Sequence, residues 1–214
     1  MASTKLAITD TLPLPNSTVK IPRLGFGVYE PLGRDCVVAV LAALKAGYRH
    51  IDTAQDYGNE KEVGEAFRQS GLKRSEVFIT TKIAYNKGSV EDTYQCVLDS
   101  ARAIDGEDGL VDLFLVHTAD IGLAGRKEVW LALEKLLEAG RARSIGVSND
   151  WIGHIEEMMP YAKIWPPMIN QIEVSQLKLT VNVSLNMNEF YTMSFLGLLS
   201  NLYNLLAPPL VPTP

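Results

Sequence analysis

Short apolar runs rich in β-branched residues alternate with longer, helix-like segments along the first 178 residues. The apolar runs predict buried strands at 24–28, 48–53, 77–82, 111–117, 143–148 and 168–174. Near-continuous apolar strands are typical of a parallel sheet that is covered by helices. The intervening pattern predicts helices at 34–46, 59–70, 89–103, 126–139 and 151–158.

Residues at the ends of these segments support the helices. Gly47, Gly71 and Gly140 each follow a predicted helix, where glycine commonly ends helical structure. Asn59 is a candidate N-cap, and Ser89 with an acidic residue three positions later resembles a capping box.

The strand–helix alternation repeats about every 30 residues, which predicts an α/β fold built from βα units. This spacing fits a (β/α) barrel and also fits an open doubly wound sheet. Before the first unit, short runs at 5–8 and 18–21 flank the turn-rich LPLPNS segment, which predicts an N-terminal β-hairpin.

The pattern changes after Lys178. The last 36 residues contain one of the chain's 45 charged side chains, Glu189, so a boundary is predicted between a domain at 1–178 and a tail at 179–214. Residues 190–206 could form an apolar helix that plugs the barrel, although as a membrane span that segment is marginal. Alternatively, the tail is translated non-coding sequence or the end of a decayed gene. Residues 207–214 are expected to be disordered.

Composition narrows the function. The chain has 214 residues, a net charge of −5 and 47% hydrophobic residues, which indicates a soluble globular protein and gives no basic footprint for nucleic acid. No secretory signal is visible. Cys36 and Cys96 lack metal-ligand spacing, so we expect no metal site and a reducing, cytoplasmic location. The oligomeric state stays open.

Candidate chemistry lies where the predicted strands end. Parallel strands in a barrel have their carboxyl ends at the same end of the barrel. This arrangement would bring together the polar residues at the strand ends, which are Asp52, Lys82, His117, Ser148, Asn149 and Gln171. Tyr57 lies in the loop after the second strand. A phenol is a weak acid, an ammonium group beside it lowers its pKa, and a carboxylate holds the ammonium in place. An imidazole can orient a carbonyl oxygen. Such a set suits protonation of an oxygen while a hydride arrives at carbon.

Each of these residues could also have a purely structural role. An aspartate at a strand end is often a cap or salt-bridge partner, and a lysine there often lies at the rim. Tyr57 could be a surface aromatic, His117 a hydrogen-bonded core histidine and Gln171 an internal hydrogen-bonding residue. Ser148 and Asn149 could cap the following helix. His50 and His154 are expected to be structural or exposed.

The sequence around these residues resembles the aldo-keto reductase family. The motifs are LGFGVYEP, AGYRHIDTAQDYGNEKEVGEAF, VFITTKI, VDLFLVH, WLALEKLLEAGRARSIGVSN and INQIE, in this order, covering about residues 5–176. They are most similar to small fungal and bacterial NADPH-dependent carbonyl reductases. The resemblance implies a TIM-type (β/α)8 barrel with an N-terminal hairpin, and metal-free reduction of aldehydes or ketones by NADPH in a biosynthetic or detoxification pathway.

The resemblance also implies roles for individual residues. Tyr57 corresponds to the proton donor, Lys82 to the residue that lowers its pKa, Asp52 to the partner of that lysine and His117 to the carbonyl-orienting histidine. Cofactor contacts would come from Val28, Tyr29, Asp52, Ser148, Asn149 and Gln171. The small carbonyl substrate would meet Tyr29, Tyr57 and His117.

The family pattern stops near Glu173, after six of the eight strands. In the family, the segments after strands seven and eight hold the cofactor phosphates, and no such pattern is recognisable here. The expectation is therefore an incomplete barrel that keeps its proton-transfer residues. The alternative is an inactive truncated remnant or a non-catalytic interaction protein.

Overall fold

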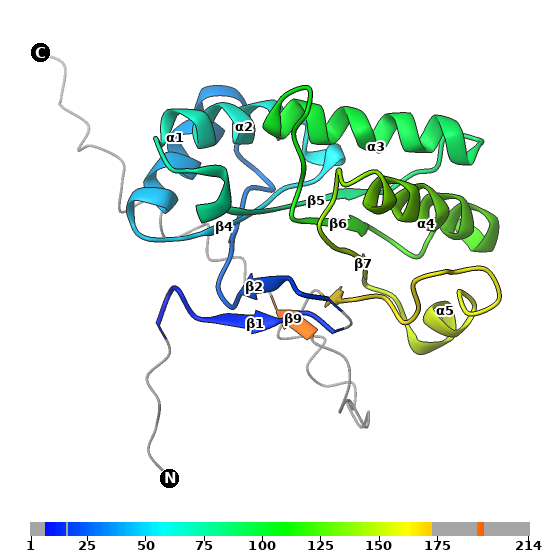
Figure 1. Ribbon diagram of the computed structural model, residues 1–214. Coiled ribbons are helices and arrows are strands. Elements are labelled where there is room, and N and C mark those ends of the chain that lie inside the picture. Colours follow the sequence, from blue (N-terminus) through cyan, green and yellow to red (C-terminus); the bar gives the residue numbers. More distant parts are fainter. Residues whose placement is uncertain (1–6, 16, 173–191, 195–214) are drawn as a thin grey trace, which may run out of the picture.

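The computed structural model describes residues 7–15, 17–172 and 192–194 (Figure 1). A two-stranded antiparallel hairpin comes first, formed by β1 (Thr11–Pro13) and β2 (Lys20–Pro22). A parallel sheet follows, with its strands side by side in chain order. The strands are β3 (Phe26–Gly27), β4 (His50–Asp52), β5 (Phe78–Ile83), β6 (Leu113–Val116), β7 (Ile145–Ser148), β8 (Asn170–Ile172) and β9 (Thr192–Ser194).

A helix follows each strand from β3 to β7. The α-helices are α1 (Gly33–Lys45), α2 (Glu60–Gln69), α3 (Val90–Asp105), α4 (Gly122–Glu138) and α5 (Ile152–Glu156), and two 3-10 helices are η1 (Gln55–Tyr57) and η2 (Arg74–Glu76). Helices α1 to α4 pack against one another in sequence and form a layer on one side of the strands (Figure 1). Parallel strands in sequential order with helices outside them form an incomplete TIM-type barrel, as predicted.

Two apolar clusters hold these layers together. The larger lies between the sheet and the helices and includes Trp130 and Phe114, both fully buried. The smaller joins the hairpin to the sheet and contains Leu14, Val19, Ile21, Phe78, Leu113, Leu115 and Ile169. The hairpin therefore covers apolar side chains of the strands.

The hairpin differs from the prediction in the position of its first strand. That strand was expected at 5–8, but the pairing partner of β2 is Thr11–Pro13, while Ala7 and Ile8 belong to a turn or its approach. The Asp10 carboxylate accepts the Ala7 amide at 2.9 Å, and the Asp10 amide donates to the Ala7 carbonyl at 3.0 Å. This local turn competes with a strand there. Pro13 is tolerated because the hairpin has only two strands and hence only edge positions.

The two predicted helix caps have different outcomes. Ser89 is confirmed as the N-cap of α3, because its hydroxyl accepts the Asp92 amide at 3.1 Å. Asn59 occupies the N-cap position of α2, but its side chain makes no capping hydrogen bond. That side chain instead connects loops beside the candidate site, as described below.

Within the described ranges, the sheet contains one more strand than the six that the sequence predicted. Thr192–Ser194 extends the sheet as β9, parallel to β8. These three residues are extended, so the alternative of a helix through 190–206 is wrong at this point. The rest of that predicted helix and the disordered end at 207–214 lie outside the described residues, and the boundary at residue 179 stays a prediction. None of the helices in the described part of the chain is long and apolar enough to cross a membrane.

Candidate active site

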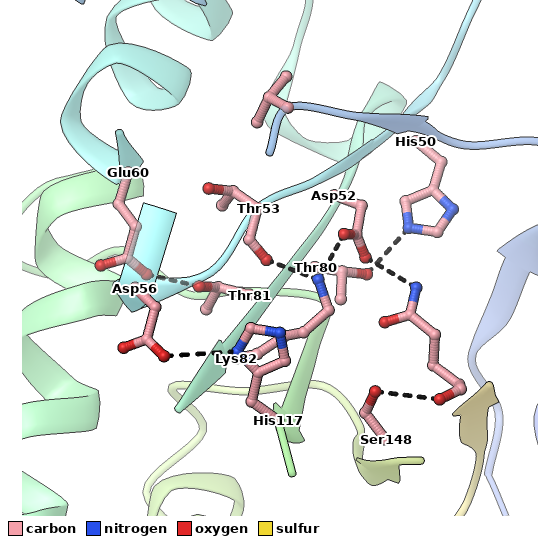
Figure 2. A network of polar contacts seen from close by, with 12 residues as sticks. His50, Asp52, Thr53, Asp56, Glu60, Thr80, Thr81, Lys82, His117 and Ser148 are labelled. Atoms are coloured by element: carbon pink, nitrogen blue, oxygen red, sulfur yellow. Dashed lines mark hydrogen bonds and ion pairs between the residues drawn. The ribbon is translucent and has the colours of Figure 1, made fainter. Parts of the chain in front are cut away.

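The ends of β4, β5 and β6 bring three of the predicted residues together. Asp52 is the last residue of β4, Lys82 lies near the end of β5, and His117 directly follows β6. Figure 2 shows these side chains converging from neighbouring strands. Adjacent parallel strands in register carry them to the same edge of the sheet, as expected.

Lys82 and Asp52 form a buried ion pair at the centre of the site. The Lys82 ammonium donates to the Asp52 carboxylate and, at 3.0 Å, to the Thr53 carbonyl. The two side chains are 3% and 7% exposed, respectively. A buried charge must be paired or hydrogen-bonded to be tolerated, and here both charges are. Asp52 is thus the partner of the lysine, as the sequence predicted.

Tyr57 is brought over this pair by η1, the short turn after β4. The Lys82 nitrogen lies 5.1 Å from the centroid of the Tyr57 ring. His117 packs against the same ring edge-on, with centroids 5.6 Å apart, and Tyr29 does so from another side at 5.1 Å. The four residues Asp52, Tyr57, Lys82 and His117 are therefore within mutual reach.

The pKa of Tyr57 differs from the expectation. Burial is the largest cause and raises the pKa above its usual value, and the negative charge of Asp52 raises it further. The predicted lowering by Lys82 is therefore not found. The reason is that burial of the phenol dominates, and that the Lys82 ammonium is paired with the Asp52 carboxylate.

The surroundings of His117 favour its neutral imidazole form. Burial lowers its pKa, the nearby Lys82 charge lowers it further, and Asp56 and Asp52 partly oppose this. Its Nδ1 lies 3.9 Å from an Asp56 carboxylate oxygen (Figure 2). A neutral imidazole has one N–H donor that can be directed at a carbonyl oxygen.

The ends of β7 and β8 add the residues predicted to hold the nicotinamide. The Ser148 hydroxyl donates to the Gln171 carbonyl at 3.0 Å, and the Asn149 side-chain amide donates to Ser148 at 3.3 Å. The alternative in which Ser148 and Asn149 cap α5 is wrong, because the N-cap of α5 is Trp151. The Gln171 amide donates to Asp52 at 3.1 Å, which connects this group directly to the ion pair.

These residues fit an amide-bearing ring. The Gln171 Oε1 atom is buried and has no hydrogen-bond partner among the described residues. A buried acceptor without a partner is costly, and a carboxamide N–H₂ group would satisfy it. Asn149 has a φ of +57°, a left-handed conformation that turns the chain sharply at the strand end. The described residues contain no cluster of acidic, cysteine and histidine side chains that could hold a metal ion.

Asn59 has a role that its interpretation as a helix cap missed. Its side chain is fully buried, and its amide donates to the carbonyls of Val28 at 2.6 Å and Pro31 at 2.9 Å. Its oxygen accepts from the Thr53 hydroxyl at 2.6 Å. Asn59 thereby fastens the loop that carries Tyr29 to the residue whose carbonyl binds Lys82. Asn59 stands directly before a helix, where an asparagine is expected to be an N-cap. The sequence therefore gives no signal that its side chain connects two loops.

His50 is structural. It is buried, its Nε2 lies 2.9 Å from the Thr80 hydroxyl (Figure 2), and burial lowers its pKa to about 4. Two hollows of about 360 and 620 Å³ lie elsewhere, the first beside the hairpin and the second beside α1 and α2. Neither is lined by the four converging residues, so the chemistry of the side chains, rather than the size of a hollow, identifies the candidate site.

Comparison with known proteins identifies the family of this chain. The sequence pattern of the Aldo/keto reductase family matches residues 27–193. The chain belongs to the aldo-keto reductase family. The match extends beyond Glu173, where the recognisable motifs end, and reaches β9.

Two similar relatives illustrate the coverage. A 9,11-endoperoxide prostaglandin H2 reductase from Trypanosoma cruzi is 40% identical over 76% of this chain and 56% of that protein. A glyoxal reductase from Bacillus subtilis is 39% identical over 78% of this chain and 59% of that protein. The chain thus spans little more than half the length of these curated relatives.

Solved structures give the same assignment. An aldo/keto reductase from Brucella melitensis is similar with a TM-score of 0.72 and 39% identity, covering 80% of this chain and 67% of that one. A Bombyx mori aldo-keto reductase in complex with NADP has a TM-score of 0.67 and 29% identity, covering 79% and 59%.

Proposed function

We propose that this aldo-keto reductase chain reduces an aldehyde or ketone to an alcohol with NADPH. The observation that carries the proposal is the convergence of Tyr57, Lys82, Asp52 and His117 at one end of the sheet. The family supports carbonyl reduction, and the NADP complex of a structural relative supports the choice of cofactor. Free Cys36 and Cys96 favour a reducing, cytoplasmic location.

The bound cofactor would supply a hydride to the carbonyl carbon. The unpartnered Gln171 oxygen, with Ser148 and Asn149 beside it, would hold the nicotinamide carboxamide. The Gln171 amide is hydrogen-bonded to Asp52. The nicotinamide ring would therefore be connected, through Gln171, to the Asp52 carboxylate that also binds Lys82.

The chain's own residues would handle the oxygen and its proton. The N–H of neutral His117 would orient the carbonyl oxygen toward Tyr57. As negative charge develops on that oxygen, the Tyr57 hydroxyl donates its proton and leaves a phenolate, which Lys82 stabilises and solvent reprotonates. The raised pKa of Tyr57 keeps the phenol protonated at neutral pH until a strongly basic alkoxide oxygen forms.

Tyr57→Phe tests this assignment. The substitution removes the donated proton and leaves the ring contacts in place, so we expect kcat to fall by about 10²–10⁴-fold while NADPH binding stays largely intact. The measurement is NADPH oxidation with a panel of small aldehydes and ketones, together with cofactor fluorescence titration. Tyr85→Phe, at an exposed tyrosine, is the matched control.

The second candidate is a non-catalytic interaction protein. The wild-type chain distinguishes the two candidates. Failure to bind NADPH at millimolar concentration would favour the non-catalytic candidate. Retained turnover in Tyr57→Phe would exclude Tyr57 as the acid.

A further inference from the structure

Glu60 is a half-buried acid beside the candidate site that the proposed proton transfer does not use. It is the first residue of α2, and both of its carboxylate oxygens accept hydrogen bonds. The Thr81 hydroxyl donates to one oxygen at 2.5 Å, and the Ser100 hydroxyl donates to the other at 2.9 Å. Figure 2 shows Glu60 reaching Thr81 from the helix side of β5.

The first of these contacts leads to Lys82. Thr81 and Lys82 are consecutive in β5, and successive side chains of a strand point to opposite faces. Lys82 therefore enters the ion pair with Asp52 on the inner face, while Thr81 meets Glu60 on the outer face. A hydrogen bond to Thr81 fixes the segment of strand that carries the ammonium.

The second contact leads to Tyr57. Ser100, on α3, also accepts a hydrogen bond from the Gln55 side-chain amide at 2.8 Å. Gln55 begins η1, the three-residue turn that ends at Tyr57. The Glu60 carboxylate thus lies between the strand that carries Lys82 and the turn that carries Tyr57. It is hydrogen-bonded to the strand through Thr81, and it is connected to the turn through Ser100 and Gln55.

The electrostatic surroundings of Glu60 argue against a role for this residue as an ion-pair partner. Burial raises the pKa of Glu60, and the hydroxyl groups of Thr81 and Ser100 oppose that increase. Among the described residues no cation forms a salt bridge with it; its two partners are neutral hydroxyls. A half-buried carboxylate bonded only to hydroxyls acts through the geometry of its two acceptor oxygens.

We propose that Glu60 is a positioning residue, which holds the Tyr57 phenol and the Lys82 ammonium at the separation that proton transfer requires. This inference rests on the proposed reductase function. A misplacement of about 1 Å in a reacting group can lower a rate by about 10²-fold, so a residue two hydrogen bonds from the acid can affect turnover without touching substrate.

The test compares Glu60→Ala, Glu60→Gln and Glu60→Asp with Glu65→Gln, an exposed position on the same helix. Glu60→Ala is expected to lower kcat by about 10–100-fold with little change in the Kd of NADPH. Glu60→Gln keeps the side-chain length and an acceptor for Thr81 but presents an N–H₂ donor to Ser100 in place of the second acceptor, so it should recover part of the loss. Glu60→Asp keeps the charge but is too short, so it should remain impaired. Glu65→Gln should match wild type.

A second readout separates this inference from the proposed function. The ¹³Cζ resonance of Tyr57, assigned with Tyr57→Phe, reports the surroundings of the phenol whether or not the chain turns over. We expect Glu60→Ala to shift or broaden that resonance and to leave the resonance of Tyr161, which follows α5, unchanged. Absence of turnover in wild type would count against the reductase proposal alone. An unchanged Tyr57 resonance, or Glu60→Asp performing better than Glu60→Gln, would overturn the positioning role. If Glu60→Ala does not fold, the Gln and Asp variants decide.

Discussion

The two carboxylate oxygens of Asp52 have different partners, one in the proposed proton transfer and the other in the proposed cofactor site. One oxygen binds the Lys82 ammonium, and the other accepts the Gln171 amide. Burial is the main reason why the pKa of Tyr57 is raised, and the negative charge of Asp52 adds to that increase. A single side chain therefore sets both the charge beneath the phenol and the orientation of Gln171.

Asp150 is a second buried carboxyl group, and it lacks such partners. It is 6% exposed, its Oδ1 atom has no hydrogen-bond partner in the described part of the chain, and burial raises its pKa to about 7. The unfolded-state pKa is about 3.9. Because the folded value is higher, the fold disfavours the ionised form, and the free energy of unfolding should fall as the pH rises from about 4 through 7.

Asp150→Asn removes this titration. We expect the variant to be more stable than wild type by about 1–3 kcal/mol at pH 8, with the difference shrinking toward pH 4. Urea unfolding at several pH values measures it, with exposed Asp120→Asn as the control. A difference that does not vary with pH would contradict the prediction.

Among the elements, α2 is fixed closely against α3. Gly64, in α2, has no side chain, and a Cβ atom there would lie 2.4 Å from the Ile104 carbonyl oxygen and 2.8 Å from that of Ala103. Such distances require the helices to move apart. The close approach matters for the site because α2 begins with Glu60 and α3 carries Ser100.

Gly64→Ala is therefore expected to destabilise the fold by about 1–3 kcal/mol, although alanine is the better helix former. Gly153→Ala, in α5, is the matched control because nothing lies within 4 Å of the added methyl group. Thermal unfolding of both variants measures the effect. Equal midpoints for the two variants would show that the helices can separate without cost.

The order and type of the elements could be predicted from the sequence, because the signals are local. The spacing of apolar residues indicates strands and helices, and a glycine often marks the end of a helix. Lys82 and Asp52 could be placed at one mouth because both end parallel strands. The contacts of Asn59 and Glu60 could not be predicted, since each joins segments that are far apart in the chain, and Asn59 stands where a cap is expected. The three residues of β9 lie in a tail with a single charged residue and gave no strand signal of their own.

At the scale of the molecule, the hairpin is joined to the barrel by one small apolar cluster. Ile21 is 1% exposed and packs with sheet residues such as Phe78 and Leu113. Leu12, on the facing strand, is only partly buried against the same cluster. The cost of removing methyl groups grows with the cavity left behind.

Ile21→Ala should lower the free energy of unfolding by about 2–4 kcal/mol, and Leu12→Ala should lower it less. Denaturant unfolding followed by circular dichroism measures both. A hairpin that contributes little to the fold would instead give equal, small changes for the two variants.

The order of the strands has a consequence for synthesis. Asp52, Tyr57, Lys82 and His117 come from successive βα units, and each strand pairs with the next one made. Contacts between neighbouring units close short loops and can form early. As the nascent polypeptide emerges from the ribosome, the four side chains can meet once β6 and His117 are outside, and Gln171 joins them last.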